Sequence, residues 1–107
     1  MPRKLIHYLR SERRRAALTQ ADVAVLLGTK WISKVSRYEG RLATPPLETA
    51  LAYEAVLGKP VASLFGGTYD EVRAAVRRRA RKLLTRTPPA TTPLRARRKR
   101  SLERIAT

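Results

Sequence analysis

One short segment of the chain combines apolar and hydrogen-bonding residues in a spacing that suits the recognition of a base edge. Val35 and Tyr38 stand one helical turn apart, so a helix could bury both against a core. Four donors fill the positions around them: Ser33, Lys34, Ser36 and Arg37. Arginine can donate two parallel hydrogen bonds to guanine O6 and N7, and lysine and serine can reach bases or phosphates. The segment predicts a helix that is anchored on one side and presents donors to DNA on the other.

Three nearby residues are further candidates for DNA contacts. Gln20 stands at the start of the preceding predicted helix, where a phosphate backbone would pass, and Arg41 is a cation just after the donor-bearing segment. For Trp31, we favour a packed position in the turn over a contact with the sugar-phosphate backbone. Glu39 is expected to be structural and to pair with an arginine of the first helix such as Arg13.

These residues need a scaffold, and the apolar pattern predicts that it is all-α. Apolar residues recur at steps of three and four, and no stretch alternates as a strand would. Two capping boxes are predicted, at Thr19 with Asp22 and at Thr68 with Glu71. Glycines 28, 40, 58 and 66–67 are expected to end helices. The predicted helices cover about 3–16, 20–27, 32–39, 47–57, 61–65 and 68–86.

Several apolar side chains are candidates for the inward faces of these helices. In the second predicted helix they are Val23, Ala24, Leu26 and Leu27, and in the fourth they are Leu47, Ala50, Leu51, Tyr53 and Leu57. In the helix at 68–86 a stripe is formed by Tyr69, Val72, Val76, Ala80 and Leu83. We expect this stripe to pack on the core of its own chain rather than to form a dimer seam.

Charge is the unusual property of the composition. Twenty-four lysines and arginines stand against eight acids in 107 residues, a net charge of +16. Such a surplus repels itself in a compact chain, so it indicates a polyanionic partner: DNA, RNA or an anionic membrane face. Residues 1–66 hold eleven of these cations and five acids, and residues 67–107 hold thirteen cations and three acids. Most of the surplus therefore lies in the last two-fifths of the chain.

The same composition predicts three segments. Residues 1–67 form the apolar-rich domain, 68–86 a basic helix, and 87–107 a Pro/Thr-rich linker with a basic tail. The tail contains the run Arg95 to Arg100, and the spacing of Leu102, Ile105 and Ala106 would suit a short amphipathic helix. We expect this run to lie along phosphates without reading sequence.

Several classes of protein are disfavoured. The chain has no cysteine and a single histidine, His7, so no metal site or disulfide is expected. No apolar run is long enough to span a bilayer or to serve as a signal peptide, so a cytoplasmic, nucleoid-associated protein is expected. No acid/base pair, nucleophile arrangement or phosphate-cradling glycine loop is evident, and neither an enzyme nor a cofactor is predicted.

Taken together, residues 9–65 resemble the lambda-repressor/Cro (Xre-type) class of helix-turn-helix domains. The resemblance rests on three blocks: Leu9, Arg10 and Arg13; Leu18, Thr19, Gln20, Val23, Ala24, Leu27 and Gly28; and Val35, Ser36, Arg37, Tyr38 and Glu39. The segments at 46–51, 56–58 and 61–65 match the closing helices of that class. The turn before the third helix is one residue longer than the common family pattern, with Trp31 and Ile32 in the insertion. The resemblance implies a five-helix fold and sequence-specific DNA binding.

The sequence thus predicts a DNA-binding transcriptional regulator, in the first place a repressor. Its predicted partner is double-stranded DNA, and a homodimer is one assembly that it allows. An antitoxin-like module that binds both DNA and a protein partner is the alternative. A packaging protein that binds nucleic acid without sequence preference is a third reading.

Overall fold

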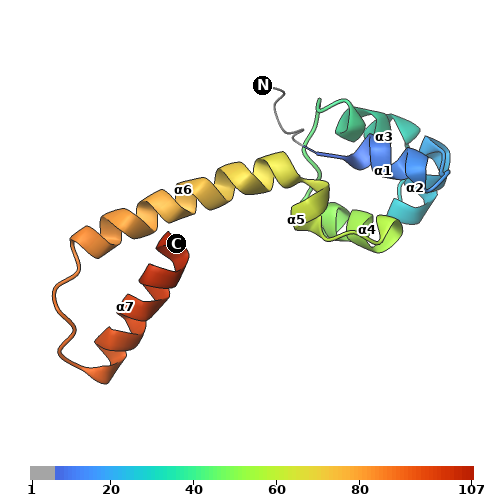
Figure 1. Ribbon diagram of the computed structural model, residues 1–107. Helices are drawn as coiled ribbons and strands as arrows, with labels where there is room; N and C mark the ends of the chain where they lie inside the picture. The colour runs from blue at the N-terminus through green and yellow to red at the C-terminus, as the bar shows by residue number, and fades with distance from the viewer. Residues whose placement is uncertain (1–6) are drawn as a thin grey trace. The chain divides into compact units, whose positions relative to one another are not determined.

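The computed structural model describes residues 7–107, and these form seven helices joined by loops, with no strand in that part of the chain (Figure 1). The predicted all-α class is confirmed. The helices are α1 (Leu9–Arg15), α2 (Gln20–Leu27), α3 (Ile32–Glu39), α4 (Leu47–Leu57), α5 (Val61–Leu64), α6 (Gly66–Thr85) and α7 (Pro93–Ala106). The chain divides into two units, Met1–Tyr69 and Asp70–Thr107.

The first unit is organised around one apolar core to which helices α1 to α5 contribute. Its buried members are Leu9, Val23, Ala24, Val35, Tyr53 and Leu64. Helix α2 packs against both α3 and α4, α1 packs against α3, and α4 packs against α5. The backbone N–H of Tyr8 donates to the carbonyl of Leu64 at 2.7 Å, which ties the start of α1 to α5. The core thus fixes α3 on its Val35 side.

Three leucines predicted to face inward do not. Leu26, Leu47 and Leu51 have more than half of their surface exposed. Helices α2 and α4 carry apolar residues on more than one face, so periodicity alone does not single out the buried side. Ala50 and Tyr53 are the buried residues of α4.

Helix ends follow the local signals in most places. Thr19 and Asp22 form the predicted capping box, and Gly28 and Gly58 end α2 and α4 in the left-handed conformation, with φ of 79° and 68°. The predicted start of the first helix is wrong within the described residues, because Tyr8 is the N-cap and α1 begins at Leu9. Its earlier part, residues 3–6, lies outside the described residues.

The predicted start of the sixth helix is also wrong. Helix α6 begins at Gly66, so Gly66 and Gly67 lie within its first turn and Thr68 is helical rather than a cap. The N–H of Tyr69 donates to the carbonyl of Phe65 at 2.8 Å, which carries the helical hydrogen-bond pattern straight through the two glycines.

In the second unit, α7 turns back toward α6 after the loop at residues 86–92, and the two helices approach each other near the end of α7 (Figure 1). Thr92 caps α7 by accepting from the N–H of Arg95, and Pro93 occupies the first turn. At the other end of α7, Arg81 Nε donates to the carbonyl of Ala106 at 3.2 Å. The basic tail is therefore a helix of 14 residues rather than a short terminal one.

The apolar stripe of α6 was expected to be packed, and only Ala80 is buried. The other four members, Tyr69, Val72, Val76 and Leu83, are 39 to 56% exposed. Within the described residues, none of the helices combines the length and apolar character that a bilayer-spanning segment requires.

Candidate nucleic-acid interface

The structure holds α2 at its N-terminus by a reciprocal pair of hydrogen bonds. Thr19 Oγ1 accepts from the N–H of Asp22 at 3.0 Å, and Asp22 Oδ2 accepts from the N–H of Thr19 at 2.9 Å. Hydrogen bonding from the backbone N–H and the side chain of Thr19 holds the pKa of the Asp22 carboxyl below its usual value. The start of α2, and with it the position of Gln20, is fixed locally.

The turn between α2 and α3 is fixed by backbone geometry and one side chain. Gly28 adopts a positive φ that other residues rarely take, and the N–H of Thr29 donates back to the carbonyl of Ala24 at 3.0 Å. Thr29 Oγ1 then accepts from the N–H of Trp31 at 3.2 Å. The prediction that Trp31 is packed is wrong, because 64% of its surface is exposed. The indole therefore projects beside the start of α3.

Helix α3 has the two-sided character that its sequence predicts. Val35 is fully buried, Tyr38 is half-buried and packs edge-on against Tyr53, and Glu39 is buried at the end of the helix. The four predicted donors are all exposed: Ser33, Lys34, Ser36 and Arg37. The structure thus leaves the donor set open to a partner while the opposite side is locked into the core.

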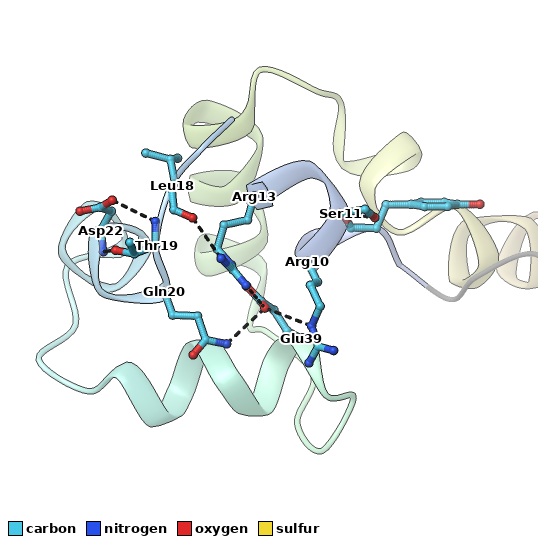
Figure 2. Close-up of polar contacts among 9 residues, drawn as sticks. Arg10, Ser11, Arg13, Leu18, Thr19, Gln20, Asp22 and Glu39 are labelled. Atoms are coloured by element: carbon cyan, nitrogen blue, oxygen red, sulfur yellow. Dashed lines mark hydrogen bonds and ion pairs between the residues drawn. The ribbon is translucent and has the colours of Figure 1, made fainter. Parts of the chain in front are cut away.

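Glu39 is the centre of a polar cluster that joins three helices (Figure 2). Arg13 of α1 donates from Nε to Oε2 at 2.6 Å and from Nη2 to Oε1 at 3.0 Å. Gln20 Nε2 of α2 donates to Oε1 at 3.2 Å, and Arg10 Nε lies 3.5 Å from the same oxygen. Arg13 Nη1 also donates to the carbonyl of Leu18 at 3.0 Å. The expected pairing of Glu39 with Arg13 is confirmed.

The electrostatics of this cluster favour the ionised carboxylate. Burial by itself would raise the pKa of Glu39, but the hydrogen bonds from Arg13 and Gln20 and the charges of Arg13 and Arg10 outweigh it and lower that pKa. The hydrogen bonds that Arg13 donates to Glu39 raise the pKa of Arg13. A buried charge is costly unless it is paired and hydrogen-bonded, and here both conditions hold. The end of α3 is therefore clamped to α1 and α2.

The structure places the other two predicted contact residues as follows. The amide of Gln20 is half-buried and engaged with Glu39, so its orientation is set by the cluster. Arg41 is exposed and has a φ of 64°, whereas Gly40, the predicted end of the helix, has a φ of −82°. The N–H groups of Arg41 and Leu42 donate to the carbonyls of Tyr38 and Arg37, at 3.2 and 2.9 Å. Arg41 is thus the left-handed residue that closes α3.

The sequence reasoning missed two members of the Glu39 cluster as partners of that carboxylate. Arg10 precedes Arg13 by one helical turn, so the two share a side of α1 and both could have been assigned to the same acid. The role of Gln20 depends on how α2 packs on α3, and no local pattern shows it.

A shallow hollow lies beside the turn. Its volume is about 330 Å³, and its lining includes Lys30, Trp31, Lys34 and Thr49. Two lysines, two aromatic rings and two threonines, with Tyr38 and Thr29 as the remaining aromatic and hydroxyl members, therefore line an open space at the start of α3. The described residues contain no group of three or more histidine, cysteine, aspartate or glutamate side chains arranged to hold a metal ion.

Comparisons with family models, with curated proteins and with solved structures return no match for this chain.

Proposed function

We propose that the protein binds double-stranded DNA in a sequence-dependent manner and acts as a transcriptional regulator, in its simplest form a repressor. One observation carries the proposal: α3 is locked into the core by Val35 and Glu39 while four hydrogen-bond donors on it stay exposed. A helix that reads bases needs this combination, since donors must be both accessible and rigidly placed.

The arrangement of α1 to α5 around one core supports the resemblance to the lambda-repressor/Cro class. The matched blocks fall on α1, on α2 with its closing glycine, and on α3. In this proposal α3 enters the major groove, which is about 12 Å wide, and Arg37 pairs with a guanine. Gln20, Trp31 and Arg41 lie around α3 and contact the sugar-phosphate backbone.

In this proposal, the net charge and the donors on α3 make different contributions to DNA binding. The net charge of +16 supplies affinity through the neutralisation of phosphates and the release of counterions, without selecting a sequence. The donors on α3 supply the selection. If two copies bind one operator, their half-sites lie about 34–36 Å apart, centre to centre.

The deciding experiment is the selection of bound sequences from random duplex DNA at a fixed salt concentration. The proposal expects an enriched motif, and Arg37→Ala should relax the choice at one of its positions. Binding that is tight but without any enriched motif would instead indicate a nucleic-acid packaging protein.

A second candidate is an antitoxin-like module that binds DNA and a protein partner. The observation that favours it is the exposure of large apolar side chains on α2 and α4, where Val25 and Leu47 are 76 and 73% exposed. Co-expression with the product of an adjacent gene, followed by size-exclusion chromatography, tests it. A stoichiometric complex that Val25→Glu or Leu47→Glu abolishes would support this candidate, and no complex would count against it.

A further inference from the structure

The bend between α6 and α7 forms a cavity, open to solvent, that the proposed function does not use. Its volume is about 470 Å³, and it lies wholly within the second unit. Its lining comes from the end of α6, the loop and the start of α7: Leu83, Arg86, Thr87, Pro88, Arg95 and Arg98. Three arginines thus converge on one space whose lining includes no acidic residue.

Two of the guanidinium groups are oriented by neutral hydroxyls. Arg95 Nη1 donates to Thr91 Oγ1 at 3.1 Å, and Arg98 Nη1 donates to Thr87 Oγ1 at 3.2 Å. The hydroxyl of Thr87 is itself fixed, because it donates to the carbonyl of Leu83 at 2.7 Å. A hydroxyl positions a guanidinium without neutralising its charge. The cavity therefore keeps the full positive charge of its arginines.

The fold brings these arginines together from the two sides of one loop. Arg86 directly follows α6, whereas Arg95 and Arg98 lie one turn apart on α7. Capping of α7 by Thr92 sets the start of that helix, and thus the position of Arg95. Arg95 and Arg98 belong to the basic run of the tail, and the bend of the chain adds Arg86 to them from the other side of the loop.

We propose that this cavity binds phosphate groups of a nucleic-acid backbone, as a discrete site that grips without reading sequence. Guanidinium groups match phosphate oxygens with paired, charge-assisted hydrogen bonds. The cavity falls within the range of about 300–1,000 Å³ typical of ligand sites, and Leu83 and Pro88 provide an apolar wall for a sugar. The inference rests on the proposed function for its choice of ligand.

Phosphates are favoured over an acidic peptide by charge density. Duplex DNA carries one negative charge per about 1.7 Å of its axis, so it can satisfy several clustered arginines at once. Residues 67–107 hold thirteen cations against three acids, which continues the positive surface beyond the cavity. A backbone that enters the cavity would meet further cations on either side.

The test uses the full chain and changes the shape of the cations while keeping their charge. The cavity variant carries Arg86→Lys, Arg95→Lys and Arg98→Lys. The control variant carries Arg73→Lys, Arg78→Lys and Arg104→Lys, three exposed arginines of the second unit that lie outside this cavity. The probe is a short duplex of random sequence at fixed salt. We expect the cavity variant to bind about tenfold more weakly, the value of one charge-assisted hydrogen bond, and the control to bind as the parent does.

Two results would overturn the inference. Equal affinities of the two variants would mean that the arginines act only as diffuse charge. The second result has two parts: the cavity variant binds the duplex as tightly as the parent does, and poly-glutamate displaces the duplex from the parent but not from the variant. That result would assign the cavity to acidic peptides. Circular dichroism of both variants checks that α6 and α7 remain helical. Because Arg86 lies outside the helices, the single variant Arg86→Lys gives a second measure of the cavity's contribution to duplex affinity.

Failure of this site is distinguishable from failure of the proposed function. The cavity variant should lose affinity for selected and random duplexes by the same factor, so its sequence preference stays intact. Arg37→Ala should lose preference and keep most of its affinity for random DNA. If the cavity variant binds random duplexes more weakly and the selection yields no motif, the phosphate site in the cavity is supported and the base-reading role of α3 is rejected.

Discussion

Arg13 binds both carboxylate oxygens of Glu39, at 2.6 and 3.0 Å, across 26 positions of the sequence. The Glu39 side chain has no exposed surface, and that of Arg13 is 11% exposed. The pair therefore acts as a two-point clamp between α1 and the last residue of α3. It determines how firmly the exposed donors of α3 are held when they meet a partner.

Glu39→Gln should destabilise the first unit by about 3 kcal/mol. The substitution keeps the size of the side chain but leaves the Arg13 charge without its buried counter-charge, and breaking one half of a buried pair has a large cost. Denaturant unfolding followed by circular dichroism measures the effect. Glu12→Gln is the matched control, because Glu12 faces the exposed Arg15 at 3.6 Å and should change stability by less than about 1 kcal/mol. Similar losses in the two variants would contradict the clamp.

Thr19→Ala and Thr68→Ala should differ although both threonines stand in a capping-box pattern. Only Thr19 makes the capping bonds, so its loss should cost about 1 kcal/mol. Thr68 lies inside α6, where alanine is the better helix former, so its replacement should be neutral or stabilising by up to about 0.5 kcal/mol. Thermal unfolding of both variants makes the comparison. A loss at Thr68 equal to that at Thr19 would place the start of α6 after the glycines.

Arg41→Gly should raise stability and lower DNA affinity. Arg41 closes α3 in the left-handed conformation, which is unfavourable for a residue other than glycine. Glycine removes this strain but has more conformational entropy in the unfolded chain, so we expect a net stabilisation of roughly 0.5–1 kcal/mol. The lost cation should weaken binding to all duplexes. Ala17 closes α1 with a φ of 59°, so Ala17→Gly should give the stability gain alone. Denaturant unfolding measures the stability effect, and fluorescence-anisotropy titration with duplex DNA measures the affinity effect. Weaker DNA binding by Ala17→Gly would indicate that the backbone change, rather than the lost cation, lowers the affinity.

Arg37→Ala should reduce the preference for the selected sequence by about 1–3 kcal/mol, the value of one bidentate contact with a base. The measurement is the ratio of affinities for selected and random duplexes at one salt concentration. Arg79→Ala removes the same charge from α6 and should lower both affinities together. An unchanged ratio in Arg37→Ala would remove Arg37 from the base-reading set.

Stability should fall in two steps as the solution is acidified. Burial lowers the pKa of His7 from 6.5, with the charge of Arg41 acting in the same sense, so protonation favours the unfolded chain and stability declines below pH 6.5. The pKa of Glu39 is also lowered, from 4.5, so its contribution is present above pH 4.5 and is lost as the pH falls through the folded value. His7→Gln should flatten the decline of the unfolding free energy that begins below pH 6.5, and Glu39→Gln should flatten the decline that begins below pH 4.5. Parallel profiles for parent and variants would contradict both assignments.

Local stereochemistry explains the elements that could be predicted from the sequence. Helix α4 has the predicted bounds because Pro46 precedes its first residue and Gly58, in the left-handed conformation, follows its last. The pairing of Arg13 with Glu39 could be anticipated because few acids are available to so many arginines. Each of these predictions depends on residues close in sequence or on charge alone.

Two different causes explain the errors. Gly66 and Gly67 suggest a stop, yet glycine ends a helix only where it adopts a positive φ, and here both glycines take helical geometry at the start of α6. Leu47 and Leu51 suggest a core face, yet α4 turns Ala50 and Tyr53 inward. The cavity of the second unit depends on how a proline-rich loop bends, and composition does not encode that bend.

The exposed indole at the head of α3 makes the protein its own optical probe. Trp31 is the single tryptophan of the chain, and it lies beside the donors that the proposal assigns to the major groove. Its emission reports on that neighbourhood without a label and without interference from another indole. A duplex that settles over α3 should change this emission, whereas one held only by the second unit should leave it unchanged, so one titration can tell the two modes of binding apart.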